Sequence, residues 1–144
     1  MAVRRLALFY AILAAAGLIL SAWLWYHATH TTVLFCPSGG GCNTVQQSPY
    51  AHFLGLPVAA WGAFYYLLAV FVAGWWALAA PGQMLSWLVL VLAAAGEAVS
   101  FYLTYLELFV IRAVCFWCLV SAAITTLLLV TAVAARRAAA RRPA

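Results

Sequence analysis

The sequence is poor in charged residues and almost free of acidic ones. Charged side chains make up 6% of its 144 residues and only two residues are acidic, whereas 69% are hydrophobic. Soluble domains are about a quarter charged and about half apolar. A soluble protein of this length could not keep so much apolar surface from water. The composition therefore excludes a soluble globular domain, a disordered chain and a nucleic-acid-binding protein with a basic face, and it indicates a membrane protein.

Four hydrophobic stretches are each long enough to cross a bilayer as a helix, which takes about 20 apolar residues. They cover about residues 6–26, 57–79, 84–109 and 114–135. The first is longer than a typical signal-peptide core, so we expect it to be retained. Without an internal repeat or a second-domain linker, residues 1–144 are predicted to form one all-α domain, a four-helix membrane bundle. A loop of residues 27–56 and a turn at Pro81-Gly82 join the first three spans.

The arginines predict how this bundle lies in the membrane. Arg4 and Arg5 precede the first span, and four more follow the last one. An even number of spans puts both termini on one side, which the positive-inside rule makes cytoplasmic. Arg112 is the exception, because it falls on the outer side. The arginines after the last span are Arg136, Arg137, Arg141 and Arg142.

All four cysteines are predicted to lie at the outer face. Cys36 and Cys42 are separated by five residues in the long loop, and Cys115 and Cys118 form a Cys-x2-Cys pair at the start of the last span. A helix N-terminus stabilises the thiolate, which is the attacking species in disulfide exchange, and Arg112 could add to this effect. A Cys-x2-Cys pair can cycle between dithiol and disulfide. The glycine-rich loop pair could reach an outside protein and bend back to the membrane.

Other interpretations of the cysteines remain open at this point. Two structural disulfides would suit an outer surface, although a Cys-x2-Cys bridge closes almost no loop entropy. A zinc site made of the cysteines and His52 lacks the usual second Cys-x2-Cys. A haem protein would want histidines inside the spans, whereas His27, His30 and His52 lie at or beyond the surface.

The segment of residues 48–55 is predicted to be a short helix on the outer surface. Ser48 suits the N-cap, Pro49 the first helical position and Gly55 the left-handed position after the end. Ser48 could instead act near the reactive cysteines.

Glu97 is predicted near the middle of the third span, where an ionisable group is costly and usually functional. Its spacing from Ser100, Thr104 and Glu107 puts all four on one helix face, which should look into the bundle. Glu97 could be protonated and hydrogen-bonded to a neighbouring helix, or it could supply protons to a buried redox site. Glu107 could pair with Arg112.

Several aromatic residues could line an apolar pocket for a flat ring. Trp61, Phe64 and Tyr65 begin the second span, and Trp117 lies between the last two cysteines. Packing alone would also explain each of them.

These motifs, taken together and in order, resemble the vitamin K epoxide reductase family, specifically its bacterial disulfide-forming members, over about residues 6–135. The two cysteine pairs are one part of the match. The other parts are residues 42–48 (CNTVQQS), 53–62 (FLGLPVAAWG) and 100–107 (SFYLTYLE).

The resemblance implies a four-helix bundle around a quinone of the ubiquinone, menaquinone or vitamin K type, with no metal. It implies that a separate thioredoxin-like (DsbA-type) protein on the outer face gives electrons to Cys36. Cys42 would then attack Cys115, and Cys118 would face the quinone. Ser48 occupies the position of a loop Ser/Thr that helps to organise the site.

The sequence departs from the vertebrate members at two quinone contacts. Residues 57–61 are apolar where those enzymes carry an asparagine, and Ala122 replaces a tyrosine. We therefore expect a thiol–quinone oxidoreductase of the bacterial inner membrane, a monomer that drives disulfide formation in exported proteins. A reductase of vitamin K or its epoxide is one alternative, and a non-catalytic membrane protein with two structural disulfides is another.

Overall fold

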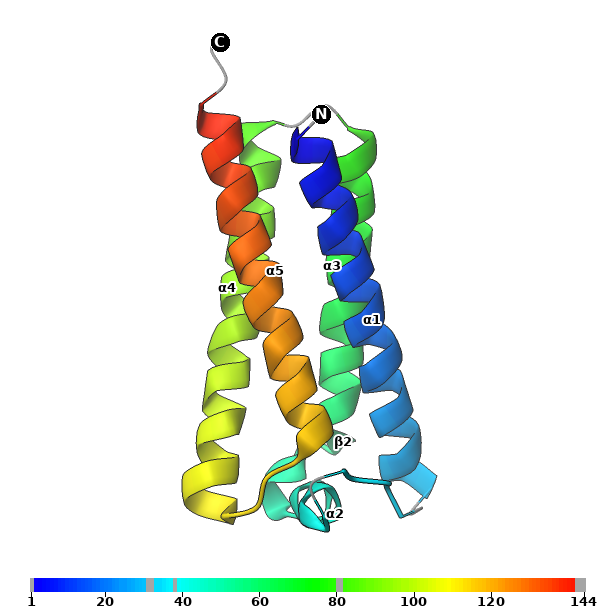
Figure 1. The fold of residues 1–144 in the computed structure, drawn as a ribbon. Helices are drawn as coiled ribbons and strands as arrows, with labels where there is room; N and C mark the ends of the chain where they lie inside the picture. The colour runs from blue at the N-terminus through cyan, green and yellow to red at the C-terminus, as the bar shows by residue number, and fades with distance from the viewer. Residues whose placement is uncertain (1, 31–32, 38, 80–81, 142–144) are drawn as a thin grey trace.

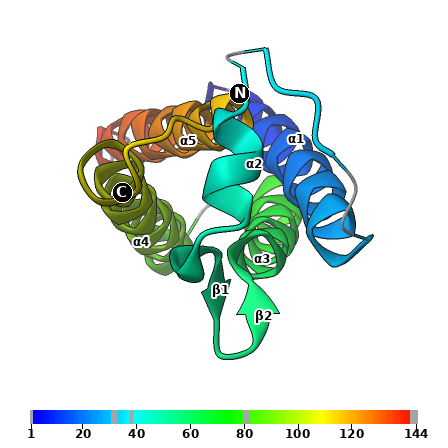
Figure 2. The same ribbon diagram turned by 90° about the horizontal axis from the view of Figure 1, so that it is seen from below.

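Four long helices run side by side and form a ring in the order α1, α3, α4, α5 (Figures 1 and 2). This computed structural model describes residues 2–30, 33–37, 39–79 and 82–141. All four helices are long and apolar enough to cross a membrane, which confirms the predicted all-α bundle. Their bounds are α1 Ala2–His30, α3 Val58–Leu78, α4 Gln83–Tyr105 and α5 Phe116–Ala140.

The first and last helices extend beyond the hydrophobic stretches that predicted them. α1 includes Arg4 and Arg5, whose side chains are exposed, and α5 continues through Arg136 and Arg137. Hydropathy marks the apolar part of a helix, whereas the helix itself ends where its backbone hydrogen bonds end. Pro81 of the predicted Pro81-Gly82 turn lies outside the described residues. Arg142 also lies outside them.

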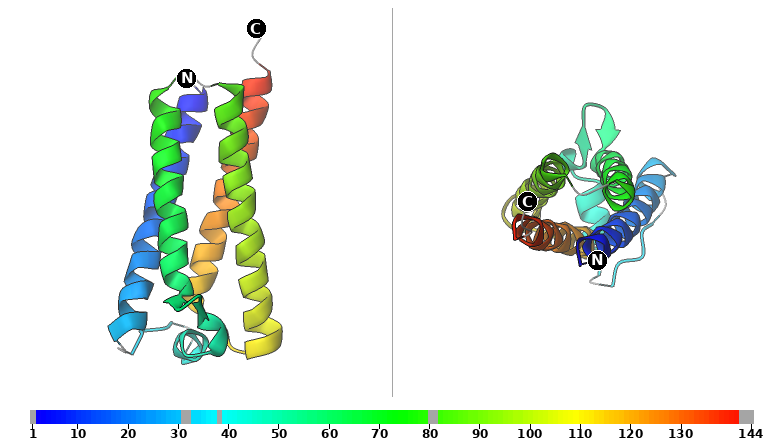
Figure 3. Two further views of the ribbon diagram at one scale, coloured as in Figure 1. Left: turned by 180° about the vertical axis from the view of Figure 1, so that it is seen from behind. Right: turned by 90° about the horizontal axis from the view of Figure 1, so that it is seen from above.

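The start of α1 and the end of α5 lie at one end of the bundle, and the connection from α1 to α3 covers the other (Figures 1 and 3). This connection contains a short helix, α2 (Gly41–Gln46), and a 3-10 turn, η1 (Pro49–Ala51). A hairpin of β1 (His52–Phe53) and β2 (Leu56–Pro57) follows and projects beyond the ring in Figure 2. A short helix therefore exists in the connection between the first two long helices, although α2 precedes the segment in which it was predicted.

The predicted helix over residues 48–55 is wrong beyond Ala51. The chain pairs Phe53 with Leu56 in an antiparallel register, which leaves Leu54 and Gly55 as a two-residue loop. Both loop residues have positive φ, at 53° and 80°, as type I′ hairpin turns require. Gly55 does adopt the left-handed conformation, but in a hairpin turn rather than at a helix end.

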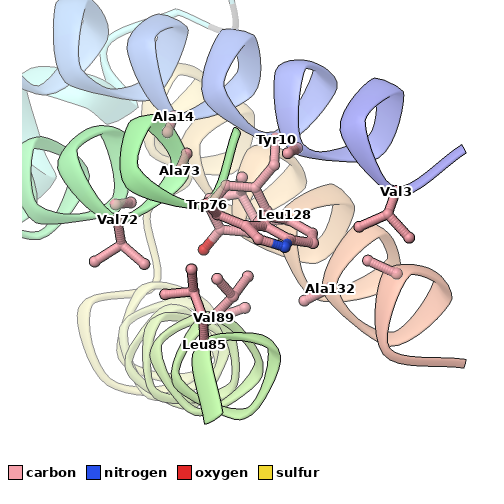
Figure 4. Close-up of a cluster of buried hydrophobic side chains, with 14 of the residues drawn as sticks. Val3, Tyr10, Ala14, Val72, Ala73, Trp76, Leu85, Val89, Leu128 and Ala132 are labelled. Carbon is pink, nitrogen blue, oxygen red and sulfur yellow. The ribbon is translucent and has the colours of Figure 1, made fainter. Parts of the chain in front are cut away.

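The core near the termini is built from small residues and a few large rings (Figure 4). Tyr10, Trp76 and Leu128 are buried among alanines from all four helices, and the rings of Tyr10 and Trp76 meet edge to face at 6.3 Å. Small residues let helix backbones approach closely, which drives helix association in lipid. Gly17 shows how tight this packing is, because a Cβ there would collide with the ring of Tyr66.

The contact between α1 and α3 predicts a stability effect. We expect Gly17→Ala to lower the melting temperature of the purified protein, because overpacking a well-filled site costs about 1–3 kcal/mol. Gly74→Ala is the matched control, since a Cβ at Gly74 meets no atom within 4 Å. Thermal unfolding in detergent measures both variants. Equal melting temperatures for the two variants would contradict this description of the packing.

Candidate functional site

The four cysteines lie together at the end of the bundle that α2 covers. Cys36 and Cys42 form a disulfide with their Cα atoms 5.8 Å apart, whereas Cys115 and Cys118 are thiols. Cys42 and Cys115 are both completely buried and belong to one apolar cluster with Leu34. Cys36 is only half-buried. The loop pair therefore has one sulfur near the surface and one directed toward the inner pair.

The loop is held against the start of α5 by close backbone contact. A Cβ on Gly41 would collide with the carbonyl oxygen of Val114, so only glycine permits this approach. The side chain of Asn43 bonds both backbone groups of Leu34, accepting from its N–H at 2.9 Å and donating to its carbonyl at 3.0 Å. These contacts fix α2, and Cys42 with it, beside Cys115.

Cys115 occupies the N-cap position of α5. Its sulfur accepts a hydrogen bond from the backbone N–H of Cys118 at 3.3 Å. A hydrogen bond from the Cys118 thiol has the largest effect on the pKa of the Cys115 thiol and lowers it, and the backbone amides of Cys118 and Trp117 lower it further. Burial opposes them, but the net pKa is below the usual value. The predicted activation of a cysteine at this helix start therefore falls on Cys115.

A π-helical turn, η2 (Leu106–Ile111), connects α4 to this site. Arg112 follows it in the left-handed conformation, with φ 56° and ψ 36°, and reverses the chain. The Glu107 carboxylate is buried and accepts a hydrogen bond from the Cys115 amide at 3.2 Å. The expected pairing of Glu107 with Arg112 is therefore wrong, because Glu107 turns inward while Arg112 is exposed.

A cavity of about 300 Å³ lies between α3, α4 and α5, with α2 and η1 over its outer end. Cys118 lines it, and Cys115 lies behind Cys118 in the buried cluster. Trp61, Tyr65 and Ala122 line the cavity, as predicted for a ring-binding pocket. Glycines shape the wall, since a Cβ on Gly96 would collide with the Tyr65 hydroxyl.

Two predicted pocket residues lie elsewhere, which corrects the expectation. The indole N–H of Trp117 donates to the Phe35 carbonyl at 2.7 Å and so anchors the cysteine loop. Phe64 is half exposed and packs against Trp25 and Trp61 on the outside of the bundle.

The polar groups near Cys118 come from α2 and η2. The Gln46 amide lies within hydrogen-bonding reach of the Cys118 sulfur, at 3.8 Å, and Glu107 lines the cavity at the same end. Ser48 also lines it, but its hydroxyl donates to the Val45 carbonyl at 2.7 Å and makes no side-chain cap of η1.

Glu97 does not line the cavity and lies behind the side chains that form its wall. Its carboxylate contacts the hydroxyls of Thr125 and Thr126 on α5 at 3.0 Å each. Thr125 and Ser100 line the cavity, whereas Glu97 lines a second, shallower hollow between α4 and α5. The expectation of a hydrogen bond to a neighbouring helix is therefore confirmed, and α5 is that helix.

The wall of the cavity is largely apolar, with polar side chains near Cys118 and near Ser100. Pockets that bind small organic ligands generally combine apolar walls with a few polar groups in this way. Among the described residues, no group of three or more His, Cys, Asp and Glu side chains comes together at a possible metal site.

Three important residues were not identified as such from the sequence: Gln46, Asn43 and Tyr66. Gln46 and Asn43 lie within the segment 42–48, which signals the family but does not show which side chain reaches a sulfur. Tyr66 is buried and its hydroxyl pairs with Ser121 at 2.8 Å. Its position one residue after Tyr65 gave no sign that it faces α5.

The contact between Gly41 and Val114 predicts the accessibility of the inner pair. We expect Gly41→Ala to push α2 away from α5, so that an alkylating reagent modifies Cys115 faster than in the parent protein. Gly40→Ala is the matched control, because a Cβ there meets nothing within 4 Å. Mass spectrometry of the modified cysteine gives the rates. Equal alkylation of Cys115 in the two variants would refute the sealing role of Gly41.

The sequence model of the vitamin K epoxide reductase family matches residues 8–133 of this chain. The match covers all four long helices and both cysteine pairs. The chain therefore belongs to this family. Together with its four apolar helices, membership identifies a multi-pass membrane protein with oxidoreductase activity of the thiol and quinone kind.

Proposed function

We propose, on the premise of this family membership, that the protein oxidises a thioredoxin-like protein and reduces a membrane quinone. The cysteine end of the bundle would face the periplasmic or extracytoplasmic side of a bacterial inner membrane. The reaction would drive disulfide formation in exported proteins. The observation that carries this proposal is the position of Cys118, whose sulfur lines the apolar cavity while Cys36 lies near the outer surface.

The first step takes place at the loop disulfide. A thiolate of the partner attacks Cys36, a mixed disulfide forms, and Cys42 leaves as a thiolate. The partner's second thiol then breaks the mixed disulfide, so the partner leaves oxidised and the loop pair is reduced. Exposed Val33 and Phe35 precede Cys36 and offer an apolar surface beside it.

The second step passes both electrons to the inner pair. Cys42 attacks Cys115 of the Cys115–Cys118 disulfide, and Cys118 leaves and takes a proton. Cys36 then attacks Cys42, which restores the loop disulfide and releases Cys115 as a thiolate. The low pKa of Cys115 suits it to this role, because a low-pKa thiol leaves faster. The pairing seen in the structure corresponds to the state after this step.

The third step takes place in the cavity. A bound quinone is the electron acceptor, since its reduction to hydroquinone takes up two electrons and two protons. Gln46 orients the Cys118 sulfur, and α2 and η1 cover the outer end against water. The Trp61 N–H and the Tyr65 hydroxyl already donate to Phe53 and Leu92, so these side chains contribute ring surface to the ligand.

Removing Cys118 tests the electron path. Purified protein supplied with a reduced thioredoxin-like donor should reduce quinone, and Cys118→Ala should lower the rate to that of a protein-free control. Cys115→Ala should leave a loop pair that accepts electrons from the donor but does not pass them on. Quinone absorbance and thiol titration follow the two halves of the reaction. Quinone reduction that persists in either variant would show that the order is wrong.

Trapping tests the entry point of electrons. In Cys42→Ala, the Cys36 thiol should attack a thioredoxin-like protein whose second active-site cysteine is replaced by serine and whose first cysteine carries a thionitrobenzoate leaving group. The mixed disulfide should persist, because neither a second loop sulfur nor a second partner sulfur can release it. Cys36→Ala is the matched control and should trap little, since Cys42 is fully buried. Non-reducing gels show the adduct. Equal trapping by both variants would overturn the assignment of Cys36.

A further inference from the structure

The proposed reaction leaves the inner pair one proton short of what hydroquinone formation needs. Oxidation of a Cys115 thiolate and a Cys118 thiol to a disulfide releases two electrons but only one proton. Hydroquinone formation takes up two of each. One further proton must therefore reach the cavity from another group.

The cavity has a sulfur end and a hydroxyl end. Cys118, Ala122 and Thr125 follow one another at i, i+4 and i+7 along α5, which places them on one face over about 10 Å. All three line the cavity, and Ser100 of α4 joins Thr125 at 3.0 Å. A quinone with one oxygen near Cys118 would direct its other oxygen toward these hydroxyls.

Behind the hydroxyl end lies Glu97. Its Oε2 is 3.0 Å from the Thr125 hydroxyl, which is itself 3.0 Å from Ser100. Thr125 is 3% exposed, so this connection is shielded from solvent. Two hydroxyls thus connect the carboxyl group to the cavity, and hydroxyls can pass a proton because each both donates and accepts.

The cluster around Glu97 has more hydrogen-bond contacts than its hydroxyl groups have protons. The Thr125 hydroxyl contacts Glu97, Ser100 and the Ala122 carbonyl, and the Thr126 hydroxyl contacts Glu97 and the same carbonyl. Three hydroxyls supply three protons for these five contacts, and a protonated Glu97 adds a fourth. An ionised carboxylate without a cation partner is also costly at this depth in a membrane.

We propose that Glu97 is the proton donor for the quinone oxygen that faces away from Cys118, and that Thr125 and Ser100 relay the proton. This inference rests on the proposed function. The Cys115 thiolate, the Cys118 thiol, quinone and protonated Glu97 become a disulfide, hydroquinone and ionised Glu97, so charge and protons balance. Glu97 then recovers a proton from water.

Three other titratable groups that line the cavity are already engaged, and Tyr50 belongs to η1 at the cavity's cysteine end. The Tyr65 hydroxyl donates to Leu92 and the Tyr66 hydroxyl pairs with Ser121, both from α3. Glu107 lies at the sulfur end, where it accepts from the Cys115 amide. Glu97 is the carboxyl group connected to the hydroxyl end.

Glu97→Gln tests the proposal, because glutamine can still hydrogen-bond to the threonines but has no carboxyl proton to give. We expect kcat for quinone reduction to fall about 100-fold, as for loss of a general acid, with KM changed less than about threefold. Transfer of electrons from the donor to the inner pair should keep its parent rate. Thr125→Val should show the same split between kcat and KM.

Thr131→Val is the matched control, since Thr131 is a buried α5 threonine whose hydroxyl bonds only within its own helix, to Leu127. This variant should leave both electron transfer to the inner pair and quinone reduction unchanged. Infrared spectra provide a readout independent of turnover. The carboxylic-acid C=O band of the parent protein should weaken in Glu97→Gln without any quinone present.

The outcomes separate this proposal from the proposed function. If the parent protein reduces quinone and Glu97→Gln matches its kcat, the proton role of Glu97 is wrong, while the proposed electron transfer from the cysteines to quinone stands. A rise in KM alone, or an unchanged infrared band, would equally overturn it. Failure of the parent protein itself to reduce quinone would instead refute the proposed function.

Discussion

The burial of Cys42 against the start of α5 is the constraint on which the other features of the site depend. Disulfide exchange needs two sulfurs in contact, yet the two pairs belong to segments more than seventy residues apart in the chain. The backbone of Gly41 packs directly on Val114, and Asn43 ties α2 to Leu34. A side chain at position 41 would separate the pairs, whereas a Cβ on the neighbouring Gly40 would meet nothing within 4 Å.

The same short helix also covers the cavity. Val45 and Gln46 follow Cys42 within α2 and line the cavity, while Cys42 faces the buried cluster with Cys115. Any movement of Cys42 toward or away from Cys115 would therefore also move the cover of the cavity. In the proposed reaction, electron transfer between the pairs and exclusion of water from the cavity would both depend on this contact, so a substitution that loosens it should affect both.

The sequence was sufficient to predict the bundle and the four cysteines, because hydropathy and spacing act over many residues. Single side chains were harder. A glycine such as Gly55 favours the left-handed backbone conformation, which occurs both at helix ends and in hairpin turns. The sequence therefore did not distinguish the two, and the hairpin was missed. Trp117 lies next to Cys118, but successive helical residues point about 100° apart, so it faces the loop. Glu107 was expected on the inward face and beside Arg112, but its contact with the Cys115 amide was missed, since the π-helical turn that directs it there is invisible to a 3.6-residue period.

The two acidic residues show why scarcity of charge matters here. Glu97 lies in α4 and Glu107 in its π-helical extension, and among the described residues neither carboxyl group contacts an arginine. Glu107 accepts from an amide and Glu97 contacts hydroxyls. A cation beside a carboxyl group favours the ionised form and would fix it there. A hydroxyl group can donate to a carboxylate or accept from a carboxylic acid. In a membrane bundle with almost no charge, threonines can therefore hydrogen-bond to a carboxyl group in either form, and α5 provides two such threonines at Glu97.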